Sequence, residues 1–305
     1  MKVGRREIDI PNLDKVLFPD AGITKRDLVD YYRRIAGTML PHIRNRPLTL
    51  HRFPDGIDAK GFYQQNVSDY FPDWIARVRL AKEGGEVEHC MCNDAATLVY
   101  LAGQACITPH AWLARAGNPR HPDRMIFDLD PPGGDFTLVR FAAHTIRKVL
   151  EDIGLGGFVM TTGSRGLHVM VPLDAGTDFD AVRDFARRVA WVAAARAPQR
   201  LTTEQRKDKR GGRLYLDIMR NAYGQTAVAP YAVRAKPGAP VATPLEWDEL
   251  GNARLRANSY RINNIFARLA RRQDPWRGIG RRAVAIGTRE AALSRLISST
   301  GARSA

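Results

Sequence analysis

Two carboxylates stand one residue apart at the end of an apolar run, in a spacing that suits metal binding. Asp128 and Asp130 follow Met125-Ile126-Phe127, and Pro131-Pro132-Gly133-Gly134 ends the run. Side chains of a strand alternate between its faces, so residues i and i+2 point the same way. Two like charges on one face repel each other unless a cation lies between them. The pattern predicts a site for divalent metal ions, although so short a motif also suits ordinary surface acids at a strand end.

A turn farther along the chain has the composition of a phosphate-binding loop. In the run from Thr162 to His168, Gly163 and Gly166 flank a serine and an arginine. The backbone N–H groups of such a turn, together with a hydroxyl and a guanidinium, can bind phosphate oxygens. The run is no nucleophile elbow, because Thr162 stands where that motif needs glycine, and it lacks the Lys-Ser/Thr ending of a P-loop. A plain hairpin turn remains the alternative.

A third carboxylate lies inside an apolar strand. The Leu and Ile residues of the run 214–219 alternate and share one face, so Asp217 lies on the other face. An acid in such a strand needs a partner. Asp128, Asp130 and Asp217 on neighbouring strands would suit two divalent ions that bridge a triphosphate, one activating a hydroxyl and the other stabilising the leaving pyrophosphate. A salt bridge from Asp217 to a nearby arginine is an equally good interpretation.

The elements that must position these residues follow from hydrophobic periodicity. The middle of the chain is predicted to run strand, helix, two strands, helix, strand, which is typical of a split βαβ or RNA-recognition-like α/β sheet. The predicted ranges are a strand at 125–130, a helix at 137–152, a hairpin of 158–162 and 167–171, a helix at 180–195 and a strand at 214–219.

The flanking segments are less regular. Thr24 with Asp27 three residues on predicts the start of a helix that extends to about Met39, with Pro41 ending it. A strand is predicted at 48–53 and a short buried helix at 95–105. The segment after Asn252 is rich in arginine and has part of an apolar helical face.

Composition points to a globular protein with a polyanionic partner. The 305 residues are 44% hydrophobic and carry a formal net charge of +15. That charge favours nucleic acid as the partner, with an anionic membrane surface as the competing explanation. No secretory signal and no run of about 18 apolar residues is present, so a cytosolic protein is expected. Cys90 and Cys92 are too closely spaced for a normal zinc site, so these two and Cys106 are predicted to be buried thiols.

The pair Asp128 and Asp130, the turn at 162–168 and the later strand residue Asp217 follow one another in an order that resembles the archaeo-eukaryotic primase superfamily. The chain is more specifically similar to the polymerase domain of bacterial ligase D and its stand-alone relatives in non-homologous end joining. The similarity runs from Asn12 to about Trp276. Further matching stretches are Asn12–Pro19, Gly22–Lys25, His51–Gly56, Gly61–Asn66 and Ala229–Arg234.

The resemblance implies an α/β primase-polymerase fold, in which an RNA-recognition-like catalytic sheet packs against an N-terminal α/β portion and helices. One primase-polymerase domain would cover residues 1–290, followed by a flexible tail at 291–305. Within the domain, the implied parts are an N-terminal portion (1–115) with 5′-phosphate and DNA contacts, a catalytic core (120–250) and a basic helical C-terminal part (251–290).

The resemblance also implies catalytic roles at matching positions. Two ions, Mn²⁺ or Mg²⁺, would be bound by Asp128, Asp130 and Asp217. The incoming nucleoside triphosphate would be held by Ser164, Arg165, His168 and Arg234, with His110 near its sugar.

Other matching positions imply DNA contacts. A 5′-phosphate at a DNA break would be bound by Asn12, Lys15 and Lys25. A base would stack on Phe62 and Tyr63, since every base offers a π-face. The template would contact Arg210.

Two positions depart from the family pattern. Arg165 often is lysine in this family, which keeps the charge but changes its geometry, and Tyr63 often is phenylalanine. The 305 residues contain no Lys-x-Asp-Gly adenylation motif and no room for an ATP-dependent ligase module. Sealing would then come from a separate ligase, or from one removed if the chain is a fragment, and the end-binding protein Ku is an expected partner.

The expected function is template-dependent nucleotidyl transfer that fills gaps and extends 3′ ends at 5′-phosphorylated breaks, preferring ribonucleotides. The expected location is the bacterial cytoplasm, at the nucleoid. One rival hypothesis is an end-bridging protein with a decayed metal site, against which the intact acid triad argues. Another is a metal-dependent nuclease, which has no need for a triphosphate-binding turn.

Overall fold

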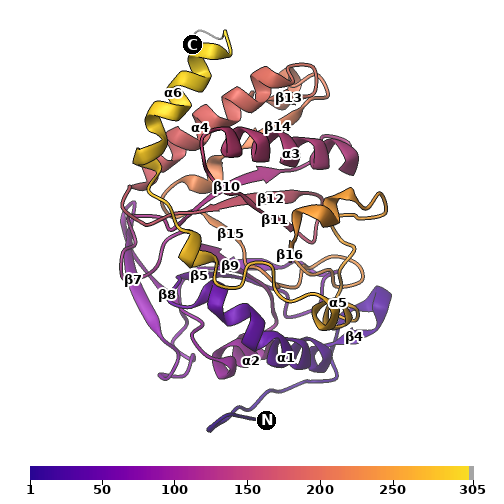
Figure 1. Ribbon diagram of the computed structural model, residues 1–305. Coiled ribbons are helices and arrows are strands. Elements are labelled where there is room, and N and C mark those ends of the chain that lie inside the picture. The colour runs from indigo at the N-terminus through magenta and orange to yellow at the C-terminus, as the bar shows by residue number, and fades with distance from the viewer. Residues whose placement is uncertain (302–305) are drawn as a thin grey trace. The chain divides into compact units, whose positions relative to one another are not determined.

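The computed structural model describes residues 1–301, which form two compact units. The first unit comprises Met1–Pro119, Thr226–Thr243 and Asn258–Asp274. The second comprises Arg120–Gln225, Pro244–Ala257 and the chain from Pro275 onward. The chain therefore passes between the units several times, and the predicted core segment 120–250 contributes residues to both (Figure 1).

The second unit contains a six-stranded sheet in the order β13-β14-β10-β12-β11-β16. The strands are β10 (Arg124–Leu129), β11 (Phe158–Thr161), β12 (Leu167–Pro172), β13 (Leu201–Thr202), β14 (Leu214–Asp217) and β16 (Thr243–Leu245). The strands β14, β10, β12 and β11 pair antiparallel throughout. With one helix after β10 and another after β12, this is the strand order of the RNA-recognition fold, which confirms the prediction for the middle of the chain.

Two amphipathic helices cover one face of this sheet, α3 (Phe136–Asp152) and α4 (Phe179–Arg196) (Figure 1). Asp135 and Asp178 cap their first turns by accepting hydrogen bonds from backbone N–H groups. A Cβ placed on Gly157 would meet both Leu150 of α3 and Val169 of β12. Val169 therefore points toward the helices, and its neighbour His168 points to the opposite face of the sheet.

The first unit contains a four-stranded antiparallel sheet in the order β15-β9-β5-β6. These strands are β5 (Leu48–Arg52), β6 (Phe62–Gln64), β9 (Cys106–Trp112) and β15 (Thr226–Val228). The helices of this unit are α1 (Lys25–Ile43), α2 (Ala95–Gly103) and α5 (Ile265–Arg271). Three two-stranded ribbons complete it: β1 (Lys2–Val3) with β2 (Arg6–Glu7), β3 (Val16–Phe18) with β4 (Ile23–Thr24), and β7 (Arg77–Lys82) with β8 (Gly85–Cys90).

Helix α1 begins as predicted but ends later. The Thr24 backbone N–H donates to Asp27 Oδ2 at 2.8 Å, and the Asp27 N–H donates back to Thr24 Oγ1, which forms a capping box. Pro41 was expected to end the helix, but it lies inside α1, which continues to Ile43. Proline so close to the C-terminus removes one backbone hydrogen bond of a helix whose packing supplies most of its stability.

Two further predictions concern the cysteines and the tail. Cys90, Cys92 and Cys106 are free and buried, as predicted, and burial raises the pKa of each thiol. Most of the stretch predicted as a flexible tail, 291–305, belongs to helix α6 (Glu290–Ser299), while 302–305 lie outside the described residues.

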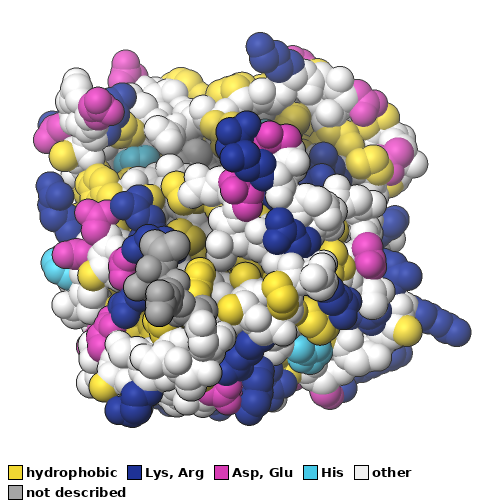
Figure 2. Space-filling model, turned by 90° about the horizontal axis from the view of Figure 1, so that it is seen from above, with side chains coloured by type: hydrophobic (Ala, Val, Ile, Leu, Met, Phe, Trp, Pro, Cys, Tyr) yellow, Lys and Arg dark blue, Asp and Glu magenta, His cyan; other side chains and the backbone are white. Residues whose placement is uncertain are grey.

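The surface is mixed in charge, and no helix among residues 1–301 is long and apolar enough to span a membrane. On the face shown in Figure 2, lysine and arginine side chains are interspersed with acidic ones rather than gathered in one patch.

Candidate active site

The acidic residues meet on one rung of the second unit's sheet. Asp128 of β10 is the direct cross-strand partner of Asp217 on β14 and of His168 on β12. Cross-strand partners in an antiparallel pair point to the same face with Cβ atoms about 5 Å apart. The three side chains therefore share the face that α3 and α4 leave uncovered.

Asp128 is the buried member of the rung and is held by an arginine and a histidine. Its Oδ1 lies 3.4 Å from Nε2 of His168, and its Oδ2 accepts a hydrogen bond of 3.2 Å from Nε of Arg220. Burial opposes ionisation of this carboxyl, but the charges and hydrogen bonds of His168 and Arg220 outweigh it and lower the pKa of Asp128 to about 2. Asp128 is therefore a permanent anion at neutral pH.

The other two acids have pKa values shifted the opposite way. Asp130 lies one residue beyond the end of β10, and its Oδ2 accepts a hydrogen bond of 3.4 Å from Arg165. Burial and then the charge of Asp128 raise the pKa of Asp130. Burial also raises the pKa of Asp217, despite a hydrogen bond of 2.7 Å that its Oδ1 accepts from the N–H of Met219. A cation bound beside Asp130 and Asp217 would therefore stabilise their ionised carboxylates, which burial and the charge of Asp128 disfavour.

The predicted phosphate-binding turn lies directly against these acids. A Cβ on Gly166 would lie 2.0 Å from the carbonyl oxygen of Leu129 and 2.5 Å from Oδ1 of Asp130, so only glycine fits there. Thr162 Oγ1 accepts hydrogen bonds from the N–H groups of Ser164 and Gly166, at 3.3 and 3.2 Å. The turn is thus fixed by its own threonine, and Arg165 and Gly166 of this turn lie beside Asp130.

The donor set of this rung suits hard divalent ions, because carboxylate oxygens are the ligands that Mg²⁺ and Mn²⁺ prefer. Among residues 1–301, however, no three His, Cys, Asp or Glu side chains already converge as a metal site. Arg165 and Arg220 hold oxygens of Asp130 and Asp128 in this structure. Metal binding by Asp128, Asp130 and Asp217 therefore remains a proposal.

The predicted template contact lies on the same unit. Arg210 follows the 3-10 turn Lys207–Lys209 and lies over the ring of Tyr215, with its guanidinium carbon 4.3 Å from the ring centroid. Tyr215 and Asp217 are two residues apart on β14, so both side chains share the face of the acidic rung. Arg210 is also held by the backbone, because its Nε and Nη2 donate to the carbonyl oxygens of Glu204 and Gln205.

The predicted 5′-phosphate residues come together in the first unit. The backbone N–H of Lys25 donates to the carbonyl of Lys15 at 2.8 Å, and that of Lys15 donates to the carbonyl of Asn12 at 3.1 Å. Asn12 has a positive φ of 56°, which turns the chain back toward the two lysines. Burial and then the charge of Lys15 lower the pKa of Lys25, as expected where two ammonium groups are held together. Lys15 also pairs with Asp55 at 2.6 Å.

The predicted stacking residues lie on β6 and are supported by a histidine. Phe62 and Tyr63 are exposed, and Tyr63 stacks on His51 with ring centroids 4.0 Å apart and planes 10° apart. His110 packs edge-on against Tyr63 at 5.7 Å. Burial and then the charges of Arg234 and Lys236 lower the pKa of His51 to about 4.

The predicted residues thus form two groups. Asp128, Asp130, Asp217, Ser164, Arg165, His168 and Arg210 belong to the second unit. Asn12, Lys15, Lys25, Phe62, Tyr63, His110 and Arg234 belong to the first unit.

Three further residues contribute to these groups and were not predicted: Arg220, Asn221 and His51. Arg220 bonds Asp128, and its spacing of three residues after Asp217 was the available signal. Asn221 is buried, and its amide bonds both the N–H and the C=O of Ile126 on β10. His51 supports Tyr63, but a histidine on an alternating strand gives no such signal.

Comparison with known proteins identifies the family of the chain. The family model for the LigD primase-polymerase domain matches residues 24–276. The multifunctional non-homologous end joining DNA repair protein LigD of Mycobacterium tuberculosis is 34% identical over 279 residues, which are 88% of this chain and 36% of that protein. The bifunctional LigD of Bacillus subtilis is 29% identical over 272 residues, covering 88% of this chain and 44% of that protein. The chain thus spans less than half the length of these curated relatives.

A solved structure matches as well. The polymerase domain of Mycobacterium tuberculosis ligase D, in complex with DNA, superimposes with a TM-score of 0.86 and 33% identity, covering 91% of this chain and 99% of that one. The chain belongs to the LigD primase-polymerase family, and its enzyme class is that of the nucleotidyltransferases.

Proposed function

We propose that this protein is a template-dependent polymerase of non-homologous end joining, which fills gaps and extends 3′ ends at 5′-phosphorylated DNA breaks and prefers ribonucleotides. The observation that carries the proposal is the acidic rung of Asp128 and Asp217 with the Ser164–Arg165 turn packed against Asp130. A site that binds a nucleoside triphosphate needs both anionic ligands for cations and donors for phosphate oxygens.

Each residue has a task in this reaction. Ser164 and Arg165 bind phosphate oxygens from a turn whose shape Thr162 fixes. Arg220 and His168 keep Asp128 ionised. Divalent ions, Mn²⁺ or Mg²⁺, bound by Asp128, Asp130 and Asp217, would supply activation of the attacking hydroxyl and charge neutralisation at the leaving group.

The first unit supplies contacts to DNA. Lys15 and Lys25, with Asn12, offer a 5′-phosphate a concentrated positive site, because burial and mutual repulsion leave Lys25 in need of an anion. Phe62 and Tyr63 offer exposed rings for a base. Arg210 of the second unit engages the template strand. DNA with gaps or breaks is therefore the proposed partner. Ku and an ATP-dependent ligase are proposed as further partners, because the relatives are named as proteins of non-homologous end joining.

The test is an extension assay on a gapped duplex with a 5′-phosphate, using ribo- and deoxyribonucleotides in parallel with Mn²⁺, Mg²⁺ or EDTA. The proposal predicts templated addition that depends on a divalent ion and is faster with ribonucleotides. Shortening of the primer would identify a nuclease instead, and stable DNA binding without any chemistry would identify an end-bridging protein.

A further inference from the structure

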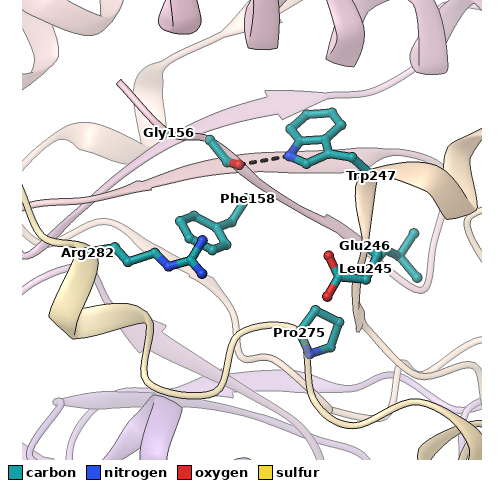
Figure 3. A pocket seen from close by; sticks show the side chains of 8 residues that line it. Gly156, Phe158, Leu245, Glu246, Trp247, Pro275 and Arg282 are labelled. Carbon is teal, nitrogen blue, oxygen red and sulfur yellow. Dashed lines mark hydrogen bonds between the residues drawn. The ribbon is translucent and has the colours of Figure 1, made fainter. Parts of the chain in front are cut away.

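The second unit contains a cavity of about 370 Å³ at the edge of the sheet where β11 begins and β16 ends (Figure 3). The residues that line it include Gly157, Phe158, Glu246, Trp247 and Arg282. A cavity of this size lies within the range of small-ligand sites in proteins. None of these residues belongs to the metal, phosphate or DNA groups described above.

Two opposite charges face each other across this cavity. In Figure 3 the carboxylate of Glu246 and the guanidinium of Arg282 point toward one another from opposite walls. Among residues 1–301 neither charge has an ion-pair partner within 4 Å, and the Glu246 carboxylate accepts only the backbone N–H of Glu249 in the capping box of its own turn. The Arg282 guanidinium lies over the ring of Phe158, 5.6 Å from its centroid. An occupant with a donor edge and an acceptor edge would satisfy both charges.

The aromatic walls are fixed in place. Trp247 Nε1 donates to the carbonyl of Gly157 at 2.8 Å. Arg147 and His144 of α3 pack on the same indole, with centroid distances of 4.8 and 5.8 Å. A wall that is rigid before binding loses little conformational entropy when a flat ligand contacts it. The cavity is therefore preorganised for a planar, aromatic occupant.

The cavity also adjoins the face that carries the acids. Asp128 and Met160 of β11 are the two cross-strand partners of His168, so all three side chains point to one face of the sheet. Phe158 lies two residues before Met160, so its side chain points to the same face of the sheet as Asp128. Phe158 lies two strands across from Asp128 and two residues along the strand direction, which separates the two residues by about 12 Å. The cavity is thus separate from the acidic rung, and its Phe158 wall lies on the same face of the sheet.

Among nucleobases, guanine matches these walls best. Its N1–H and N2 amino groups are adjacent donors that a single carboxylate can accept together, and its O6 and N7 are adjacent acceptors for an arginine fork. Adenine and cytosine present one amino group to the carboxylate, and uracil presents one N–H flanked by carbonyl oxygens. We propose that this cavity binds a guanine base, with Glu246 on its donor edge and Arg282 on its acceptor edge.

The source of the base is either a free guanine nucleotide or an unpaired guanine in a strand. The inference goes beyond the proposed polymerase function, since this cavity needs neither metal nor triphosphate. Titration calorimetry in EDTA with GMP, IMP and UMP measures the first source. Fluorescence anisotropy with a labelled oligouridine strand, with and without one central guanine, measures the second.

We expect GMP or the guanine-containing strand to bind the protein about tenfold or more tightly than its uracil counterpart. IMP, which lacks the N2 amino group, should lie between GMP and UMP. Glu246→Gln and Arg282→Gln should each remove most of this preference. Both residues are exposed, so neither change is expected to impair folding.

Asp248→Asn is the matched control, because it removes the same charge from the same turn but lies outside the cavity lining. It should leave the guanine preference within twofold of wild type. Binding of GMP alone would identify a free nucleotide as the source, and binding of the strand alone would identify nucleic acid. No guanine preference in either arm, or equal losses in Glu246→Gln and Asp248→Asn, would overturn the inference.

Discussion

Asp128 and Asp217 are direct cross-strand partners on β10 and β14, although 88 residues lie between them in the sequence. The two strands meet because the chain adds a helix, a hairpin and a second helix before β14 pairs beside β10. Two carboxylates on one rung repel each other, so the rung depends on nearby cations. In the described structure the cation beside Asp128 is Arg220, and the imidazole of His168 contacts the same carboxylate.

The close approach of the phosphate-binding turn predicts that Gly166→Ala is inactive. The new Cβ would overlap the Leu129 carbonyl and Asp130, so the turn must move away from the acids. A displacement of about 1 Å can lower activity roughly 100-fold. Steady-state extension rates measure this, and Gly133→Ala is the control because a Cβ there has nothing within 4 Å. Equal activity of the two variants would show that the turn does not serve the reaction.

The buried amide of Asn221 predicts a loss of stability on truncation. Asn221→Ala removes two hydrogen bonds that tie β10 to the turn after β14 and a third, to the carbonyl of Ile218, within that turn. The N–H and C=O of Ile126 lose their Asn221 partners. We expect the free energy of unfolding to fall by about 2 to 3 kcal/mol, measured by urea denaturation. The exposed Asn252→Ala should cost less than about 1 kcal/mol. Similar losses in both variants would contradict this role of Asn221.

The paired lysines predict recognition of a 5′-phosphate. Replacing Lys15 and Lys25 with alanine should remove any preference for a phosphorylated over an unphosphorylated end. The slope of log affinity against log salt should flatten by roughly one to two units. Arg33→Gln on α1 is the control, because its guanidinium pairs with Asp30 on the surface. Equal affinity of the wild-type protein for both ends would rule out this pocket.

The depressed pKa of His51 predicts a pH-dependent stability. Its folded pKa of about 4 lies below the ordinary value of 6.5, so between these values the unfolded chain binds a proton that the folded chain does not. The contribution of His51 to stability is therefore complete above about pH 6.5 and is lost as the pH falls toward 4. Thermal melting at pH 7 and pH 5 should show a smaller decrease for His51→Gln than for wild type. An equal decrease in melting temperature for the two proteins between pH 7 and pH 5 would contradict a lowered pKa of His51.

The sequence predicted the catalytic sheet well because its elements have strong local signals. The alternating strand at 214–217 and the glycine-flanked turn at 163–166 lie where periodicity and turn composition indicated. Asp217 was assigned to a face by alternation alone, and the structure places it on the rung of Asp128. Alternation and turn composition are set by residues close together in the sequence, so they can be read without knowledge of tertiary contacts.

Other features could not be predicted because they depend on tertiary contacts. The bond from Arg220 to Asp128 joins the turn after β14 to β10. Pro41 stays helical because packing of α1 outweighs one lost hydrogen bond. Residues 226–243 were predicted as part of the catalytic core segment 120–250 but belong to the first unit. They do so because β15 pairs with β9, a contact that no local pattern in the sequence indicates. The stacking of His51 under Tyr63 is of the same kind.

The most direct test of the account is Asp130→Ala in the gapped-duplex extension assay. The side chain of Asp130 is 48% exposed and lies beyond the end of β10, so its removal leaves the sheet intact. Loss of extension, with DNA affinity within about twofold of wild type, is the result that metal-dependent transfer at this rung predicts. Persistent extension by the Asp130→Ala protein would contradict the assignment of Asp128, Asp130 and Asp217 as the metal-binding acids.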